Sequence, residues 1–480
     1  MSARSNARWV MTSQVFRILT QTLGLAILAR ILGPAEYGLM ALVMTVVGFI
    51  TMFRDAGMGT AVIQKAELER GHIASAAWLN LAQGFLIFGL LFLGADFLGH
   101  WFANPRMASV LRLLAWSFPL YGASSIQQAL MERSSRFATM ARIEIVSSAI
   151  SFVAAILFAK SGYGVYSLAL QTLIAAALTT VQLWIAGAAS VFGIPKWKGF
   201  AEFLGFGGRL TLFSVVNYFS RNADNLLIGK YLGDVALGIY SMAYKIMLFP
   251  VQNLTFVAGR SLLPVLSRKQ GNLREVWATY LKASSMIAML AAPLFFLTIT
   301  FRWEVVRVAF GDGWLAVPPL LLWLCLVGTI QVQMSLTGSV LIALGKTALH
   351  LRLGVLSAVT QVVAFVAGIH WGMEALVKLY LLSNIVNSVF VYPALFQSVK
   401  GNAGEYLRAL MIPYASGLLL WSVFAFLRGQ MVSLQLSPIA IVLVGGAGFM
   451  CAYLSLCWLF ARSNCLDLLS MVKPGRQVEG

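Results

Sequence analysis

The chain has 480 residues, of which 59% are hydrophobic and 11% charged, and its mean hydropathy is +0.82. An ordinary soluble domain has about 25% charged residues, so this composition excludes a soluble enzyme and a disordered chain. It predicts a polytopic membrane protein whose apolar side chains are solvated by lipid. The net charge of +18 then indicates topology and attraction to anionic membrane lipids, not nucleic-acid binding.

Long apolar runs bounded by charge, Gly or Pro follow one another along the chain and predict an all-α fold of about 14 transmembrane helices. The expected spans are 9–30, 38–62, 77–98, 110–131, 143–160, 164–187, 208–232, 238–263, 281–301, 316–343, 353–370, 373–396, 407–427 and 438–460. Between them, about 21 Lys and Arg residues lie on the side of both termini and about 9 on the other. Both termini are therefore expected in the cytoplasm.

Residues 28–38 are similar to residues 228–238, and the match pairs Gly33 with Gly233 and Gly38 with Gly238. Each copy reads as a helix end, a turn bounded by Gly, and the start of the next helix. Because both copies run in the same direction, we expect two lobes related by an axis along the membrane normal.

The expected seventh span carries a polar stripe on an otherwise apolar helix. Its members are Asn217, Arg221, Asp224 and Asn225, at spacings i, i+4, i+7 and i+8. Arg221 lies about 14 Å inside the outer helix end, close to the bilayer midplane. We expect the stripe to face a water-filled cavity or other helices, with Arg221 and Asp224 partly paired.

Other cations also lie inside spans, where a charge costs about 2.5–3.5 kcal/mol. Arg17 lies between Gln14 and Gln21 on the first span, Lys245 lies on the eighth, and Arg54 lies near a cytoplasmic end, where it can snorkel. Because buried cations without enough carboxylates around them need an anionic ligand, these residues predict an anion-binding cavity.

The carboxylates inside the spans are Asp55, Asp224 and Glu374, fewer than the cations. Asp55 and Asp224 are candidates to carry a coupling proton, and an ion pair with Arg54 is an equal alternative for Asp55. For uncharged stripes such as Asn384, Asn387 and Ser388, the alternative is interhelical hydrogen bonding, worth about 0.6 kcal/mol per bond.

Motifs of soluble chemistry are missing from the sequence. The four cysteines have no metal-ligand spacing, and the four histidines form no catalytic cluster. We therefore expect no metal, no cofactor and no catalytic residues, and a protein that is not an enzyme.

Several segments carry a family resemblance. They are Leu32-Gly33-Pro34-Ala35-Glu36-Tyr37-Gly38, residues 53–64 (Phe-Arg-Asp-Ala-Gly-Met-Gly-Thr-Ala-Val-Ile-Gln), residues 224–233 and residues 238–245. They resemble the polysaccharide transporters, the Wzx-type flippases of lipid-linked oligosaccharides. The nearest members are exporters of colanic acid, exopolysaccharide or O-antigen units, within the MOP superfamily that also includes multidrug exporters.

The resemblance implies a MATE-like fold, with lobes at 1–199 and 200–400 and two additional helices at 401–480. It implies a central cationic cavity that opens alternately to each side of the bacterial inner membrane. The substrate would be an undecaprenyl-diphosphate-linked oligosaccharide, used for lipopolysaccharide or exopolysaccharide, and a polymerase and co-polymerase would be partners.

Family members place basic residues of the first, second and eighth helices around the diphosphate, and Arg17, Arg54 and Lys245 match them here. Arg221 is added from the polar stripe. The full set of expected substrate-binding residues is Arg17, Gln21, Arg54, Asn217, Arg221, Asp224, Asn225 and Lys245.

Two alternatives remain. A multidrug or cation antiporter of the same superfamily would carry acidic residues in its cavity, whereas cations dominate here. A membrane enzyme of polysaccharide assembly would carry a large outward loop with polar catalytic residues, which the sequence lacks. The sequence identifies neither the glycan nor the coupling ion.

Overall fold

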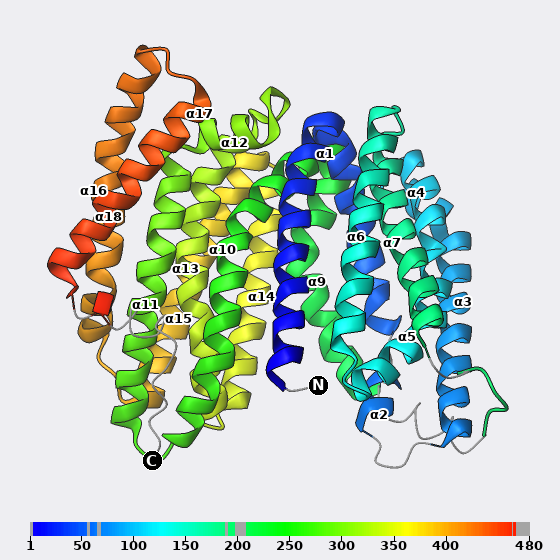
Figure 1. Ribbon diagram of the computed structural model, residues 1–480. Helices are drawn as coiled ribbons and strands as arrows, with labels where there is room; N and C mark the ends of the chain where they lie inside the picture. The colour runs from blue at the N-terminus through cyan, green and yellow to red at the C-terminus, as the bar shows by residue number, and fades with distance from the viewer. Residues whose placement is uncertain are drawn as a thin grey trace. The chain divides into compact units, whose positions relative to one another are not determined.

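The computed structural model describes residues 3–54, 58–64, 69–187, 191–196, 208–462 and 464–466 (Figure 1). These residues are almost entirely helical, and no strand occurs among them, as the composition and spans predicted. They form two compact units, residues 1–238 and 239–480. The division falls after Gly238, and the lobe boundary at 199 that the family resemblance implies stays a prediction.

The helices have the following bounds. In the first unit they are α1 (Ala3–Arg54), α2 (Met58–Gln64), α3 (Arg70–Trp101), α4 (Pro105–Ala115), α5 (Ser117–Arg133), α6 (Phe137–Lys160), α7 (Val165–Ala186), α9 (Gly208–Tyr231) and the start of α10 (Gly233–Arg268). In the second unit they are the rest of α10, α11 (Leu273–Thr300), α12 (Arg302–Phe310), η1 (Asp312–Trp314), α13 (Val317–Ala343), α14 (Thr347–Ile369), α15 (Met373–Val399), α16 (Ala403–Ser433), α17 (Pro438–Ala440), η2 (Ile441–Gly445) and α18 (Gly446–Phe460).

Eleven helices in the described part of the chain are long and apolar enough to cross a membrane. Three features explain why this number is smaller than the roughly 14 expected spans. α1 carries the first two spans, α4 and α5 share the fourth with a break at Trp116, and the polar residues of α9 make it less hydrophobic. Pro119 cannot donate a hydrogen bond to the preceding turn, which explains the break. The chain is a multi-pass membrane protein.

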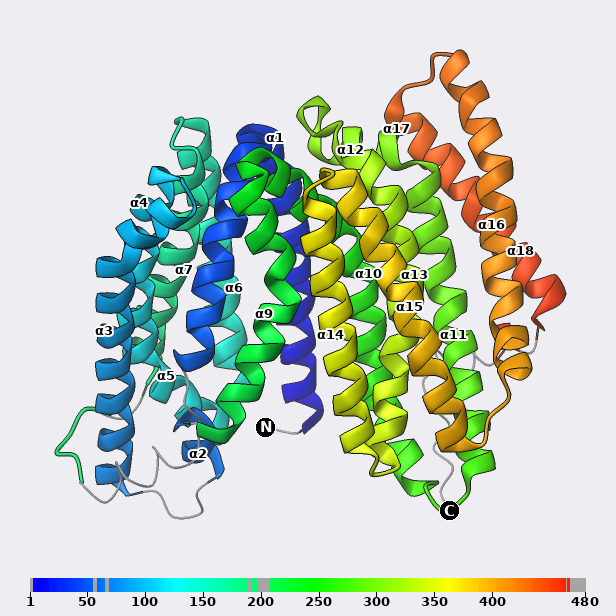
Figure 2. The ribbon, with the colours of Figure 1, turned by 180° about the vertical axis from the view of Figure 1, so that it is seen from behind.

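α1 folds back on itself at Gly33, whose φ of 73° lies in the region that favours glycine. Pro34 follows, and proline suits the first turn of a new helix because that turn needs no N–H donor. The Tyr37 hydroxyl donates to the Leu25 carbonyl oxygen at 3.4 Å, although these residues would lie about 18 Å apart in a straight helix. The two arms of α1 therefore run in opposite directions (Figure 2).

The repeated glycines meet in a reciprocal contact. Gly233 also has a positive φ, of 82°. A Cβ atom on Gly38 would lie 1.7 Å from the carbonyl oxygen of Asp234, and one on Gly238 would lie 1.9 Å from the carbonyl oxygen of Pro34. Each glycine thus packs on the carbonyl group four residues before the equivalent glycine of the other repeat. This reciprocal pattern is that of a local two-fold axis between the two turns. Only glycine permits this approach.

α9 packs against the second arm of α1, on the side of the glycine contact that leads towards the end of α1. The Tyr218 hydroxyl donates to the Thr45 carbonyl oxygen at 2.7 Å, and the rings of Phe49 and Phe219 lie 4.8 Å apart. Close to the glycine contact, Gly229 packs on the Leu42 side chain. This seam explains why α9 groups with the first unit.

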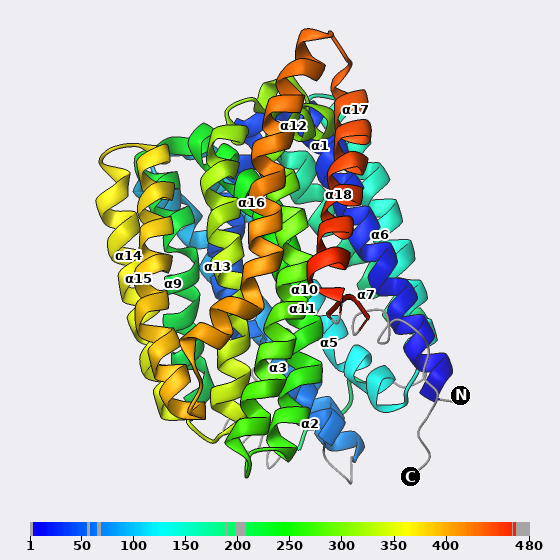
Figure 3. The ribbon, with the colours of Figure 1, turned by 90° about the vertical axis from the view of Figure 1, so that its left-hand side faces the viewer.

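The second unit is built around α11, where 72% of the apolar window is buried, the largest share of any candidate span. α11 packs on α13 and α16, and α16 runs beside α18 (Figure 3). Arg428 of α16 donates through Nε to both carboxylate oxygens of Glu304 on α12, at 2.8 and 2.9 Å. This ion pair, in which Glu304 is buried and Arg428 partly exposed, ties α16 to the rest of the unit.

Candidate functional site

Arg17 lies on the first arm of α1 and reaches towards α6. Its Nη1 is 3.5 Å from Glu144 Oε1, and its Nη2 donates to Gln14 Oε1 one turn earlier. The side chains of this ion pair are 46% and 38% exposed, and Gln21, one turn later, is also exposed. Glu144, the second residue of the expected span 143–160, was not among the residues predicted from the sequence. Arg17 therefore has a carboxylate partner on a neighbouring helix.

The polar stripe of α9 divides in the structure. Arg221 is exposed and forms no ion pair with a described residue, including Asp224. Asp224 is 3% exposed, and its carboxylate accepts from the backbone N–H of Asn225 at 2.8 Å. Asn225 itself is half-buried. Helical spacing placed these side chains on one face, but neighbouring helices cover only part of that face.

Lys245 belongs to the second unit, where it is exposed on α10. Ser241, one turn earlier, is buried, and the rings of Tyr240 and Tyr244 stack with centroids 5.8 Å apart. α10 therefore buries Ser241 and Tyr240 while it leaves Lys245 accessible. Arg17 and Lys245 are accessible cations on candidate membrane-spanning helices, and Arg221 is an accessible cation on α9, which the sequence predicts to cross the membrane.

Three expected residues give no side-chain geometry. Asp55 lies outside the described residues. Arg54 and Asn217 lie within α1 and α9, and their side chains lie outside the described part of the chain. Their roles stay predictions.

The uncharged polar residues of α13 and α15 form an internal network. Gln331 Nε2 donates to the Tyr380 hydroxyl at 2.7 Å and to Asn384 Oδ1 at 3.3 Å. Asn387 Oδ1 accepts from the Thr360 hydroxyl of α14 at 2.8 Å. Because Asn384 and Asn387 are 2% and 1% exposed, the stripe of α15 holds helices together.

Carboxylates at the helix ends of the first unit also pair with neighbouring helices. Glu36 accepts from Arg106 Nη2 at 2.8 and 2.6 Å, and from the backbone N–H of Val165 at 2.5 Å. The hydrogen bond to Glu36 raises the pKa of the Arg106 guanidinium. Asp234 accepts from Asn104 Nδ2 at 2.5 Å. These contacts fasten the two glycine turns to α4 and α7.

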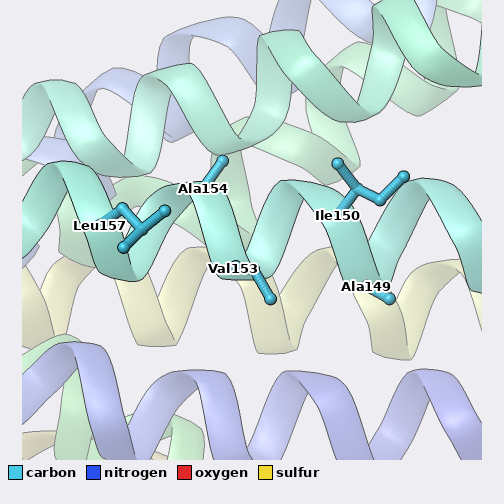
Figure 4. Close-up of a pocket in the computed structure, with 5 residues that line it drawn as sticks. All are labelled: Ala149, Ile150, Val153, Ala154 and Leu157. Carbon is cyan, nitrogen blue, oxygen red and sulfur yellow. The ribbon is translucent and has the colours of Figure 1, made fainter.

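A shallow cavity of about 390 Å³ lies along α6 (Figure 4). Its lining is apolar and consists of Ala149, Ile150, Val153, Ala154 and Leu157. Val153 follows Glu144 by two and a half helical turns, so the two side chains point to opposite sides of α6. The cavity is therefore separate from the Arg17–Glu144 pair and has the character of a lipid-facing surface. No cluster of His, Cys, Asp and Glu that could hold a metal occurs among the described residues.

The fold and these accessible cations define a polytopic helical membrane protein of the transporter type. The model of the polysaccharide biosynthesis protein family matches residues 27–319, and the chain belongs to this family. It is 24% identical over 420 residues to the lipopolysaccharide biosynthesis protein WzxC of Escherichia coli, covering 85% of this chain and 84% of that one. It is 25% identical over 474 residues to the succinoglycan biosynthesis transport protein ExoT of Rhizobium meliloti, covering 98% and 95%.

Two solved structures share the fold. The lipid II flippase MurJ, in an inward closed conformation, matches with a TM-score of 0.73 at 15% identity, covering 96% of this chain and all of that one. A multidrug resistance MATE family transporter of the MOP superfamily matches with a TM-score of 0.57 at 16% identity, covering 79% and 94%. The expected MATE-like fold is confirmed.

Proposed function

We propose that this protein is a flippase that moves undecaprenyl-diphosphate-linked oligosaccharides across the membrane for surface polysaccharide synthesis. Family membership and the transport named for ExoT support this class. The observation that carries the proposal is the accessibility of Arg17 on α1 and of Arg221 on α9, the helix of the expected seventh span. An accessible cation in such a helix, at a cost of about 2.5–3.5 kcal/mol, is expected where an anionic substrate passes.

The substrate explains why the cations are needed. A diphosphate and a hydrophilic sugar cannot cross the hydrocarbon core unaided, and Arg binds phosphate oxygens bidentately. We assign phosphate contacts at some stage of transport to Arg17, Arg54, Arg221 and Lys245. Gln21, Asn217 and Asn225 would bind phosphate or sugar hydroxyls, while the polyprenyl tail stays in lipid.

The direction of transport needs an energy source, and an ion gradient or downstream polymerisation would supply it. Asp55 and Asp224 are the proposed coupling carboxylates, and the burial of Asp224 supports its candidacy. Alternating access would present the cations first to one side of the membrane and then to the other.

The excess of Lys and Arg on one side supports an inner-membrane orientation with both termini in the cytoplasm. A polysaccharide polymerase and co-polymerase are the proposed partners, because the flipped unit must be consumed on the far side. The alternative of drug export is not favoured, because the relatives WzxC and ExoT are both named for polysaccharide biosynthesis.

The test replaces Arg221 and Lys245 singly with Gln in a strain whose only copy of the protein is the variant. We expect each variant to reach the membrane at a normal level and to lose at least about 90% of surface polysaccharide, which corresponds to about 1.4 kcal/mol of lost phosphate stabilisation. Polysaccharide is measured by gel and the protein by immunoblot.

The matched control is Lys378→Gln. Lys378 pairs with Glu374 on the surface of α15 at 2.8 Å, and water screens an exposed pair so that it contributes little to stability. The control should export normally. Normal export by both Arg221→Gln and Lys245→Gln would contradict the cationic site.

A further inference from the structure

We propose that Glu144 is a resident counter-ion that occupies Arg17 until the diphosphate of the substrate displaces it. Glu144 would thereby restrict the site to headgroups that carry more negative charge than an ordinary phospholipid. This inference rests on the proposed function and adds a specificity-determining residue to it.

The geometry of the pair favours exchange. The Nη1–Oε1 distance of 3.5 Å exceeds the roughly 2.7–2.9 Å of a charge-assisted hydrogen bond, so Glu144 holds Arg17 loosely. Both side chains are partly exposed, which leaves room for a competing anion. Gln14 anchors the guanidinium from its own helix, so Arg17 keeps its position when Glu144 leaves.

The packing of α1 on α6 does not depend on the ion pair. The ring of Phe152 on α6 packs on Gly24 of α1, where an added Cβ would lie 3.2 Å from it. At the other end of this seam, Arg142 lies over the ring of Trp9 at 5.3 Å. Because contacts on both sides hold the helices together, Glu144 is free to change partner.

Charge decides which anion displaces a carboxylate. Glu144 is tethered beside Arg17, so its effective concentration is high. A phospholipid headgroup with one negative charge binds Arg17 little better than the tethered carboxylate does. A diphosphate carries more charge and makes a bidentate contact, so it binds better. Glu144 also competes with the phosphate for Arg17 when the substrate is released. This competition prevents the substrate from remaining bound.

The experiment measures binding to the purified full-length protein in detergent, with farnesyl diphosphate and inorganic pyrophosphate as probes and phosphatidylglycerol as competitor. Glu144→Gln should bind farnesyl diphosphate about fivefold more tightly, the upper limit for releasing a half-exposed pair. Phosphatidylglycerol should compete with the probe in this variant and not in the wild type. Export in cells should fall, because phospholipid competes and release slows.

Two controls separate this role from a purely structural one. Glu374→Gln removes the same charge from an exposed pair and should leave probe affinity unchanged. Arg17→Gln should lose affinity, and adding Glu144→Gln to it should change nothing further, since Glu144 acts through Arg17. A lower melting temperature with unchanged or weaker binding in Glu144→Gln would overturn the inference and assign Glu144 to packing.

The remaining outcomes identify the failing step. If the wild type binds neither probe and does not restore export, the proposed function is wrong and the inference fails with it. Suppose that the wild type binds the probe and exports, but phosphatidylglycerol competes with the probe no better in Glu144→Gln than in the wild type. Then only the inference fails. Equal wild-type affinity for pyrophosphate and farnesyl diphosphate would overturn the assignment to a lipid-linked diphosphate.

Discussion

The polar side chains of α1 and α9 in the first unit differ from those of α13 and α15 in the second. Arg17, Gln21 and Arg221 are accessible, and the ion pair of Arg17 is loose. Asn384 and Asn387, in contrast, are almost fully buried and hydrogen-bonded to neighbouring helices. Both sets appear in the sequence as polar stripes on apolar helices.

The difference teaches that polarity inside a span has two uses. Uncharged amides that satisfy one another stabilise a helix bundle at modest cost. Charged groups left accessible do not improve packing, so they are expected to serve a ligand. Matched substitutions in the two regions should therefore produce opposite effects.

The largest difference in stability is expected between two isosteric Gln→Glu changes, one at a buried position and one at an exposed position. Gln333 on α13 is 3% exposed and donates to the Ser284 carbonyl oxygen and the Tyr414 hydroxyl at 3.3 Å each. Gln333→Glu removes these donors and buries a carboxylate, so we expect a loss of about 3–5 kcal/mol. Thermal unfolding in detergent measures it.

The matched change is Gln21→Glu, at an exposed position one turn after Arg17. It should leave the melting temperature unchanged within the error. It should reduce export, because a carboxylate near Arg17 competes with the substrate. Equal destabilisation by Gln333→Glu and Gln21→Glu would break the distinction between the two regions.

A smaller effect is expected from Gln14→Met, which keeps the side-chain length and removes the acceptor of Arg17. Gln14 is a positioning residue, so export should fall about fivefold, the equivalent of about 1 kcal/mol for one exposed hydrogen bond to a charged group. The melting temperature should be unchanged. A variant that is destabilised and exports at the wild-type rate would place Gln14 with the packing residues instead.

The smallest effect is expected from Asn387→Leu on α15. The change removes one hydrogen bond with Thr360, worth about 0.6 kcal/mol in a membrane protein. Export per molecule of protein should stay at the wild-type level. A loss of export without loss of protein would show that the network of α13 and α15 takes part in transport.

Much of the fold follows from the sequence. The apolar runs predicted the helices, and the repeat predicted both positive-φ turns, at Gly33 and Gly233. The sequence did not predict that Gly38 and Gly238 pack on each other's turns, because spacing shows where a chain turns and not what it meets there.

The candidate site was only partly predictable. The cations Arg17, Arg221 and Lys245 were found because a charge in an apolar span is rare. Glu144 was missed because spacing along the chain does not show which helix faces Arg17, and only the packing of α6 on α1 brings the two side chains together. The different burial of Arg221 and Asp224 was missed for a related reason, since helical spacing defines a face but not its neighbours.

By itself, the sequence determined that this chain belongs to a membrane, which segments are apolar and helical, and where the chain reverses. These properties depend on hydrophobicity and on backbone conformations that single residues impose. The tertiary structure alone decided which polar groups satisfy one another and which stay accessible. Pairing and burial depend on contacts between helices distant in the chain, which local patterns do not encode.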